Sequence, residues 1–322
     1  MIRMVRVVTI GGGGGHAQVL KSLKSVKNIQ ITGICPSTDT GGSTGILVDD
    51  YNANGYLGDL TKCMAALCKN EVFGKALMYR YGKGDLYKHS VKNILLLALE
   101  KVAGVENGLS TLNKLCELDP HKVIPVTRAR TKLYATLKLG NKIESETDID
   151  NLAKNPLWHP SAHAIKDIYL RPKVFASNEV SKSISNSDWI IICPGDFYTS
   201  ILPTLLPGGV KESIKKSKAK IILILNVVNK RGETDSYTAE QYVSLVEKHV
   251  GRRVNFIFCN NKDIPPKALI NYTLEDKVFF KPSTKKKDKR IRYGSFVEIG
   301  EEGLLRHNPV ALNKELKKVI FS

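Results

Sequence analysis

Two aspartates stand in short polar segments rich in glycine and hydroxyl groups, where their carboxylates could do chemistry. Asp39 lies within Ser37–Gly45, and Asp59 follows Gly58 at the start of an apolar helical pattern. A carboxylate in such a place can hold Mg²⁺ or a ribose or sugar hydroxyl, and hydrated Mg²⁺ needs only one or two protein carboxylates. For Asp59 the plainer alternative is a helix N-cap. We therefore predict Asp39 and Asp59 as metal or hydroxyl ligands, with Mg²⁺ as the candidate cation and no other cofactor assigned.

Glycines at two places offer backbone groups that suit a phosphate. Five of them run from Gly11 to Gly15, between an apolar stretch and a helical pattern, and two more precede Ser43. Turns of this kind expose successive N–H groups near the positive end of a helix dipole, where a diphosphate binds well. Two unrelated surface loops are the alternative. The predicted backbone donors are Gly12, Gly13, Gly14, Gly15, Gly41, Gly42 and Ser43.

Side chains elsewhere could complete a diphosphate site. Thr199 and Ser200 follow Pro194-Gly195 at a predicted helix start, where hydroxyls cap the helix or bond a phosphate. The guanidinium of Arg306 can bind two phosphate oxygens at once. Tyr272 could lie against a nucleotide base, although a packed surface tyrosine is the plainer interpretation.

The segments that carry these residues alternate between strand and helix patterns. Val5–Ile10, Ile29–Cys35 and Lys220–Asn226 are apolar runs typical of buried parallel strands. Open parallel sheets bind ligands outside the carboxyl ends of their strands, which is where the glycine-rich loops begin. The pattern predicts a doubly wound, mostly parallel, Rossmann-like α/β sheet. A dinucleotide-dependent dehydrogenase is disfavoured, because Ile34-Cys35-Pro36 stands where a ribose-binding acid is expected.

One segment departs from the alternating order. Residues from about 121 to 150 contain short β-type runs joined at Gly140-Asn141, which predicts an inserted β-hairpin. Strand patterns resume at Ile165–Leu170 and Asp188–Cys193. We therefore expect a single α/β domain over 1–322 with a small β-rich insertion at about 121–150.

The composition of the chain indicates which binding partners and which cellular compartment to expect. The net charge of +18 over 322 residues favours anionic ligands, but lysines in solvated stretches supply most of it, which disfavours nucleic acid as a partner. No apolar run is long enough for a membrane span, and no signal-peptide pattern begins the chain, so we expect a cytoplasmic protein. Six scattered cysteines form no C-x-x-C pair, which predicts reduced, buried thiols and disfavours a zinc site.

A series of motifs, taken in order, resembles one superfamily, that of the YvcK-type gluconeogenesis factors and the CofD-type 2-phospho-L-lactate transferases. After the glycine loop come Thr38–Gly45, Gly58-Asp59, His89-Ser90-x-x-Asn93, Pro194-Gly195-x-x-Tyr198-Thr199-Ser200, Asn226 with Gly232-Glu233-Thr234, and Arg306–Pro309. The resemblance covers nearly the whole chain. On this basis His89, Asn93, Gly195, Tyr198 and Asn226 join the predicted ligand-binding residues, although a lone histidine at a helix entrance is usually structural.

The two branches imply different functions. The YvcK type implies a cytoplasmic, homodimeric UDP-sugar-binding regulator of carbon metabolism, cell-wall supply and cell shape, with no firmly assigned reaction. The CofD type implies magnesium-dependent transfer of a phospholactyl group from a guanosine diphosphate donor to a deazaflavin. The Gly-Gly-Ser-Thr-Gly, Tyr-Thr-Ser and Gly-Glu-Thr stretches resemble the YvcK type, and the Ser-Pro-Asp-x-Asp-Thr pattern of the transferases is absent. A UDP-sugar-binding regulator is our first hypothesis, a transferase acting on a nucleotide diphosphate donor the second, and a binder of nucleic acid or anionic surfaces the third.

Several positions depart from the YvcK-type pattern. His16 directly follows the glycine run, and Thr40 stands where a second aspartate is usual. Thr61-Lys62 stands where Arg-Asn is usual. The missing carboxylate leaves open whether a metal is needed.

Overall fold

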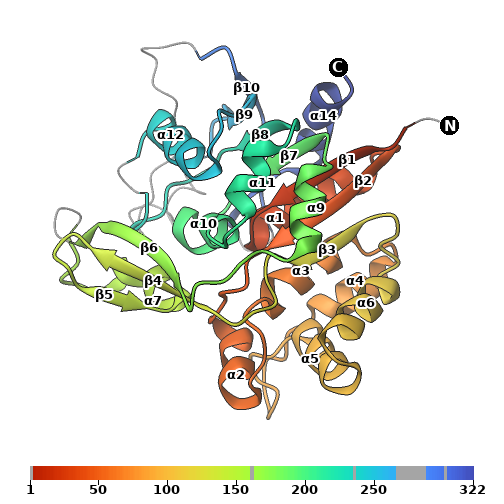
Figure 1. Ribbon diagram of the computed structural model, residues 1–322, viewed down its shortest axis with the longest axis vertical. Helices are drawn as coiled ribbons and strands as arrows, with labels where there is room; N and C mark the ends of the chain where they lie inside the picture. Colours follow the sequence, from red (N-terminus) through yellow and green to blue (C-terminus); the bar gives the residue numbers. More distant parts are fainter. Residues whose placement is uncertain (1–2, 160–162, 235–236, 266–287, 301–302) are drawn as a thin grey trace.

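A parallel sheet of seven strands, in the order β10-β9-β8-β7-β1-β2-β3, forms the centre of the fold (Figure 1). The computed structural model describes residues 3–159, 163–234, 237–265, 288–300 and 303–322. From β1 the sheet grows through β2 and β3 on one side and through β7 to β10 on the other, which confirms the predicted doubly wound α/β fold. The strands are β1 (Val5–Ile10), β2 (Ile29–Cys35), β3 (Lys122–Pro125), β7 (Trp189–Ile192), β8 (Lys220–Ile224), β9 (Phe256–Asn260) and β10 (Ile291–Gly294).

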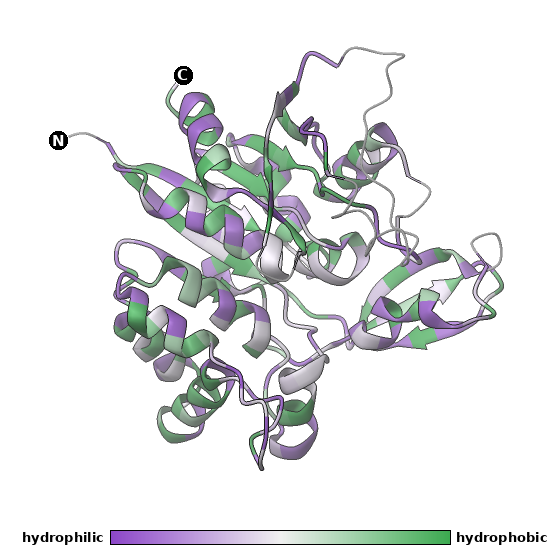
Figure 2. Cartoon of the chain, turned by 180° about the vertical axis from the view of Figure 1, so that it is seen from behind, coloured by the Kyte–Doolittle hydropathy of each residue, from purple (hydrophilic) through white to green (hydrophobic). Residues whose placement is uncertain are grey.

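Helices cover both faces of this sheet and enclose two hydrophobic cores. Successive residues of β1 point to opposite cores, Val7 to the first and Val8 to the second. Because both faces are covered, β7 and β8 are almost wholly apolar and buried, and Figure 2 shows the central strands mostly in the hydrophobic colour.

The first core receives side chains from α1 (Gly13–Lys24), α2 (Gly42–Tyr51), α3 (Leu57–Leu67), α4 (Glu71–Met78), α5 (Val91–Ala103), α6 (Val105–Leu115) and α14 (Pro309–Ile320). The second receives them from α9 (Asn178–Ser185), α10 (Leu202–Leu205), α11 (Val210–Lys216) and α12 (Ala239–Val250). A π-helical turn, η2 (Phe197–Ile201), links β7 to α10.

A small antiparallel sheet stands beside the main body, at the left of Figure 1. Its strands, in the order β5-β4-β6, are β4 (Lys132–Leu137), β5 (Lys142–Glu144) and β6 (Ile165–Arg171), and α7 (Glu146–Asp150) and the 3₁₀ turn η1 (Leu152–Lys154) follow β5. The β-rich insertion is therefore present, but its boundaries differ from the expected 121–150. The run at Val123 belongs to β3 of the main sheet, because Val123 is fully buried beside β2, whereas β6 pairs with β4.

The described C-terminal segments close one edge of the molecule. A two-stranded ladder of β11 (Val297–Ile299) and β12 (Leu305–His307) precedes α14, which packs on α1. The ring of His307 is buried and lies 3.0 Å from the carbonyl oxygen of Leu225, which ties the ladder to the end of β8. In the described ranges, no helix combines the length and the apolar character needed to cross a membrane.

Candidate functional site

A cavity of about 320 Å³ lies at the carboxyl ends of β1, β2 and β7. Its walls come from the turns after these three strands, from the starts of α2, α3 and α5, and from α7 of the insertion. The predicted ligand contacts among its lining residues are Gly13, Asp39, Gly41, Gly42, Ser43, Asp59, Asn93, Thr199 and Ser200. The structure thus brings together residues from five separate segments of the chain at the sheet edge where ligands of such folds bind.

Two helices begin at the cavity wall without a side-chain cap. Gly12 precedes the first residue of α1 and Gly41 the first residue of α2, and neither N-terminus has a side-chain cap hydrogen bond. The first N–H groups of a helix have no partner within the helix, and the dipole gives that end a positive potential. Gly13 has a φ of +65°, a conformation that suits glycine. Both helix starts can therefore donate to an anion in the cavity.

Three carboxylates surround the same space, and one of them was not predicted. Asp39 accepts a hydrogen bond of 2.8 Å from the N–H of Gly41, and Glu146 of α7 lines the cavity beside it. Burial and then the charge of Asp59 raise the pKa of Asp39 to about 6. Burial, followed by the charges of Asp39 and Asp59, raises the pKa of Glu146 to about 8. This concentration of negative charge favours a proton or a cation at the site.

The interpretation of Asp59 as an N-cap is wrong. The residue at that position is Tyr56, and Asp59 lies inside the first turn of α3. Its carboxylate comes so close to Gly12 that a Cβ atom there would stand 2.2 Å from Oδ2. Asp59 therefore lies against the glycine loop and faces the cavity.

Three basic side chains, Lys62, Arg80 and Lys92, also line the cavity, and the sequence did not single them out as ligand contacts. Lys92 is only 3% exposed, and its Nζ donates to the carbonyl oxygen of Gly58 at 2.9 Å and to Oδ1 of Asn93 at 2.6 Å. Burial, with the nearby Lys62 charge, lowers the pKa of Lys92 to about 7. A phosphate would stabilise the charged form of this lysine.

The sequence matches the family model described as 2-phospho-L-lactate transferase CofD over residues 7–296. This chain belongs to the CofD family. It is 32% identical to the gluconeogenesis factor of Bacillus subtilis over 275 residues, 84% of this chain and 83% of that protein. It is 30% identical over 322 residues to a Thermotoga maritima protein provisionally given the same name, with 98% of this chain and 99% of that protein covered.

Solved structures share the fold of this chain over nearly its whole length. Protein BH3568 of Bacillus halodurans, a member of the UPF0052 family, superposes with TM-scores of 0.88 and 0.87 in two crystal structures. Each is 28% identical and covers 99% of this chain and 100% of the other. The family match includes every residue that lines the cavity.

Magnesium, which the family implies, fits the donor chemistry of the cavity. Carboxylate oxygens are the hard ligands that Mg²⁺ prefers, and Asp39, Asp59 and Glu146 supply them. Within the described ranges these three do not form a cluster whose ligand atoms all lie within 4.8 Å of one another. Mg²⁺ held here would therefore keep several water molecules, as it does in many phosphate-binding sites.

Other predicted residues position the site. The ring of His89 lies 3.1 Å from Oγ of Ser43, and Asn93 donates to Thr44 at 3.3 Å. Asn226 bonds both backbone groups of Gly195, at 2.8 Å to the N–H and 2.7 Å to the carbonyl oxygen.

The turn after β7 is held by a buried carboxylate. Glu233 accepts from the N–H of Tyr198 at 2.8 Å and from the hydroxyl of Thr199 at 3.0 Å. This carboxylate fixes the backbone that carries Ser200 into the cavity wall.

The remaining predicted contacts lie away from the cavity lining. Gly12 immediately precedes α1, and Gly14 and Gly15 lie in the first turn of that helix, where Gly15 packs so closely on Pro194 that a Cβ atom would stand 2.1 Å from its carbonyl oxygen. Arg306 lies on β12, opposite Glu298. Tyr272 lies outside the described residues.

Proposed function

We propose that this protein binds a UDP-sugar through its diphosphate in the 320 Å³ cavity and acts as a regulator rather than an enzyme. The observation that carries the proposal is the meeting of two uncapped helix starts, at Gly13 and Gly42, with three basic side chains around one space. Neutral but oriented N–H groups and flexible cations are the usual means of holding a diphosphate.

A second cavity could hold the sugar or the base of a UDP-sugar whose diphosphate lies in the first. It measures about 540 Å³, shares Asp39 with the first, and extends between α2 and the insertion. The Thr38 hydroxyl lines it and, among the described residues, is buried without a hydrogen-bond partner. A buried hydroxyl without a partner is costly, so a sugar or base hydroxyl that bonds Thr38 would be favoured.

The regulatory part of the proposal rests on relatives. Proteins of similar sequence over most of this chain are named gluconeogenesis factors, a name that describes a role in carbon metabolism. The YvcK resemblance extends that role to cell-wall supply and cell shape. All six cysteines are free and buried, which fits the reducing cytoplasm that we propose as the location. By the same resemblance we propose a homodimer, which sedimentation analysis would test.

A magnesium-dependent transferase acting on a nucleotide diphosphate donor is the second candidate. The observation in its favour is the group of Asp39, Asp59 and Glu146 at the cavity, because Mg²⁺ between carboxylates and phosphates assists transfer chemistry. It predicts donor consumption in the presence of a suitable acceptor and Mg²⁺, abolished by Asp59→Ala.

Isothermal titration with UDP-N-acetylglucosamine, UDP and GDP, with and without Mg²⁺, tests both candidates. Arg80→Ala should weaken UDP-sugar binding about 10- to 100-fold, because a lost charged hydrogen bond costs about 1.5–3 kcal/mol. Lys83→Ala, an exposed change in the same segment, is the matched control and should bind as the wild type does. Arg306→Ala tests the cation predicted from the sequence.

The absence of heat with every uridine nucleotide would refute the first candidate. Tighter binding of GDP, together with donor turnover, would favour the second. Chromatography of the ligand after titration distinguishes binding from turnover, because a regulator returns the nucleotide sugar intact.

A further inference from the structure

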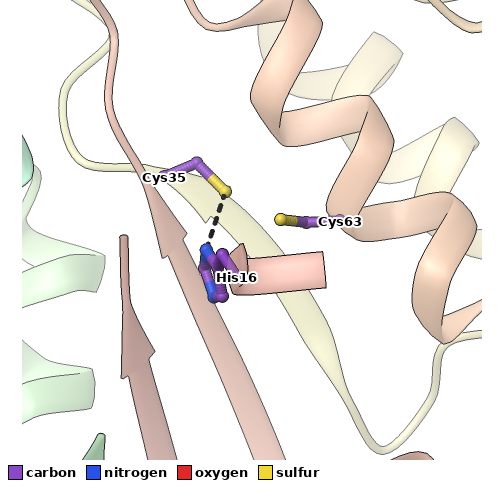
Figure 3. A group of neighbouring side chains, drawn as sticks. All are labelled: His16, Cys35 and Cys63. Carbon is purple, nitrogen blue, oxygen red and sulfur yellow. Dashed lines mark hydrogen bonds between the residues drawn. The ribbon is translucent and has the colours of Figure 1, made fainter. Parts of the chain in front are cut away.

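Three side chains that are distant in sequence meet in the core beneath the glycine loop. His16 comes from the first turns of α1, Cys35 from the last residue of β2 and Cys63 from α3, and Figure 3 shows them pointing toward one another. All three are 0% exposed. One ligand atom from each residue lies within 4.8 Å of the other two. Although the spacing of the cysteines along the sequence disfavours a zinc site, we propose from their meeting in space that His16, Cys35 and Cys63 form a binding site for one divalent, thiophilic metal ion, Zn²⁺.

The spacing of the ligand atoms suits zinc. Zinc–sulfur bonds of about 2.3 Å and zinc–nitrogen bonds of about 2.0 Å place tetrahedral ligands about 3.5–3.8 Å apart. Sγ of Cys35 lies 3.8 Å from Nδ1 of His16, which is close to that value. Small rotations of the two thiols within the 4.8 Å cluster would complete three ligand bonds. The fourth position of the metal would remain for water or another donor, as in zinc sites with three protein ligands.

The charges balance only with a divalent ion. With Cys35 and Cys63 as thiolates and His16 as a neutral imidazole, a divalent ion forms a complex with no net charge, and the protons that these ligands carry in the metal-free protein are released to solvent on binding. A neutral complex suits a fully buried position, whereas Cu⁺ would leave a negative charge.

The hydrogen bonds of His16 link this site to the glycine loop. Nδ1 lies 2.7 Å from the carbonyl oxygen of Gly11, and Nε2 lies 2.7 Å from Oγ1 of Thr9. A metal on Nδ1 displaces the bond to Gly11, while Nε2–H donates to Thr9 and orients the ring, as outer partners of zinc-binding histidines do. Asp59, one helical turn before Cys63 on α3, also lines the ligand cavity, so the two sites are neighbours.

One other group of possible metal ligands occurs among the described residues, but a lysine already neutralises part of its charge. Asp150, Asp196 and Glu233 also lie within 4.8 Å of one another. Lys230 already forms ion pairs with all three, at 3.1 Å from Asp196 and 3.6 Å from Glu233. A lysine ammonium already occupies the position that a cation would take there.

Metal analysis of the full chain tests the proposal. The protein is unfolded, refolded with reductant in Zn²⁺ or Co²⁺, dialysed and measured by mass spectrometry for metal content, because the buried site must load while the chain is open. We expect about one Zn²⁺ per wild-type chain, and for Co²⁺ the absorption bands of thiolate coordination. Cys63→Ser and His16→Asn should reduce the metal content at least tenfold. Cys259→Ser, which changes a buried cysteine outside the cluster, should keep it.

Wild-type protein decides the question even if the variants fail to fold. Refolded wild type with less than a tenth of an equivalent of zinc and no cobalt–thiolate absorption would overturn the proposal. Full metal content in Cys63→Ser would also overturn the proposal, as would a Cys35–Cys63 disulfide in protein kept under reductant. None of these results bears on nucleotide binding, which is tested separately by titration.

Discussion

The raised pKa of Glu146 makes a quantitative prediction for Glu146→Gln. An ordinary glutamate titrates near 4.5, whereas Glu146 in the folded protein titrates near 8 because of burial and the charges of Asp39 and Asp59. The folded state therefore binds a proton that the unfolded state has lost between these two values, so wild-type stability falls as the pH rises from 4.5 to 8. At about 1.4 kcal/mol per unit, the shift bounds the loss at about 5 kcal/mol. Solvent relaxation around a partly buried group will reduce the measured value.

Glutamine has nearly the shape of the protonated glutamate but cannot ionise. Glu146→Gln should therefore match the wild type in melting temperature near pH 4.5 and exceed it by a growing margin up to pH 8.5. Differential scanning calorimetry without divalent cations measures this difference. The matched control is Glu144→Gln in the same insertion, since Glu144 pairs with Lys132 at the exposed surface and its loss should change the melting temperature little. Parallel curves of melting temperature against pH for wild type and Glu146→Gln would refute the reasoning.

Three further predictions concern the same cavity. Gly12→Ala would place a Cβ atom 2.2 Å from Asp59 and should weaken nucleotide binding at least tenfold in a titration, whereas Gly14→Ala, with nothing within 4 Å, should not. Asn226→Ala removes two hydrogen bonds to Gly195 and should lower the stability in urea unfolding by about 1–3 kcal/mol, unlike the exposed Asn107→Ala. Because the pKa of Lys92 is lowered to about 7, magnesium-free nucleotide affinity should fall between pH 6 and 8 as the ammonium loses its proton. A constant affinity would contradict that last prediction, and Lys92→Met should make the affinity less dependent on pH, with the ionisation of Asp39 and Glu146 accounting for the remaining dependence.

The strands and glycine-rich loops that border the cavity can be predicted from the sequence, because each has a local sequence pattern. Buried strands such as Val5–Ile10 are recognisable as continuous apolar runs, and the glycines after β1 and β2 can be placed at the strand ends. The π-helical turn with Thr199 and Ser200 is predictable in the same way, since only residues 193–196 separate it from the apolar strand β7. The residues that reach the cavity from these three loops were therefore predictable.

Side chains that approach from other elements were not predictable in the same way. Arg80 precedes α5 in a loop without an apolar pattern, and Glu146 belongs to an insertion whose orientation no local signal fixes. His16, Cys35 and Cys63 form no spaced motif along the chain, so their meeting depends on the packing of α1 and α3 against β2. The N-cap interpretation of Asp59 failed because the helix begins at Leu57, whereas an N-cap at Asp59 would start it at Leu60.

Thr40, at the position where the YvcK-type pattern resembled by this sequence has an aspartate, contributes to the cavity by positioning another carboxylate. Oγ1 of Thr40 lies 3.0 Å from Oγ1 of Thr147 and accepts the Thr147 N–H at 3.2 Å, so this side chain attaches α7 to the loop after β2. That attachment holds Glu146 beside Gly41, where a Cβ atom would stand 3.4 Å from Asp39 and 3.9 Å from Glu146. A carboxylate from the insertion thus stands beside Asp39 and Asp59, while Thr40 supplies the contact that positions it. The acidic character on which a hydrated Mg²⁺ would depend is therefore supplied in part by Glu146 of the insertion, beside Asp39 and Asp59.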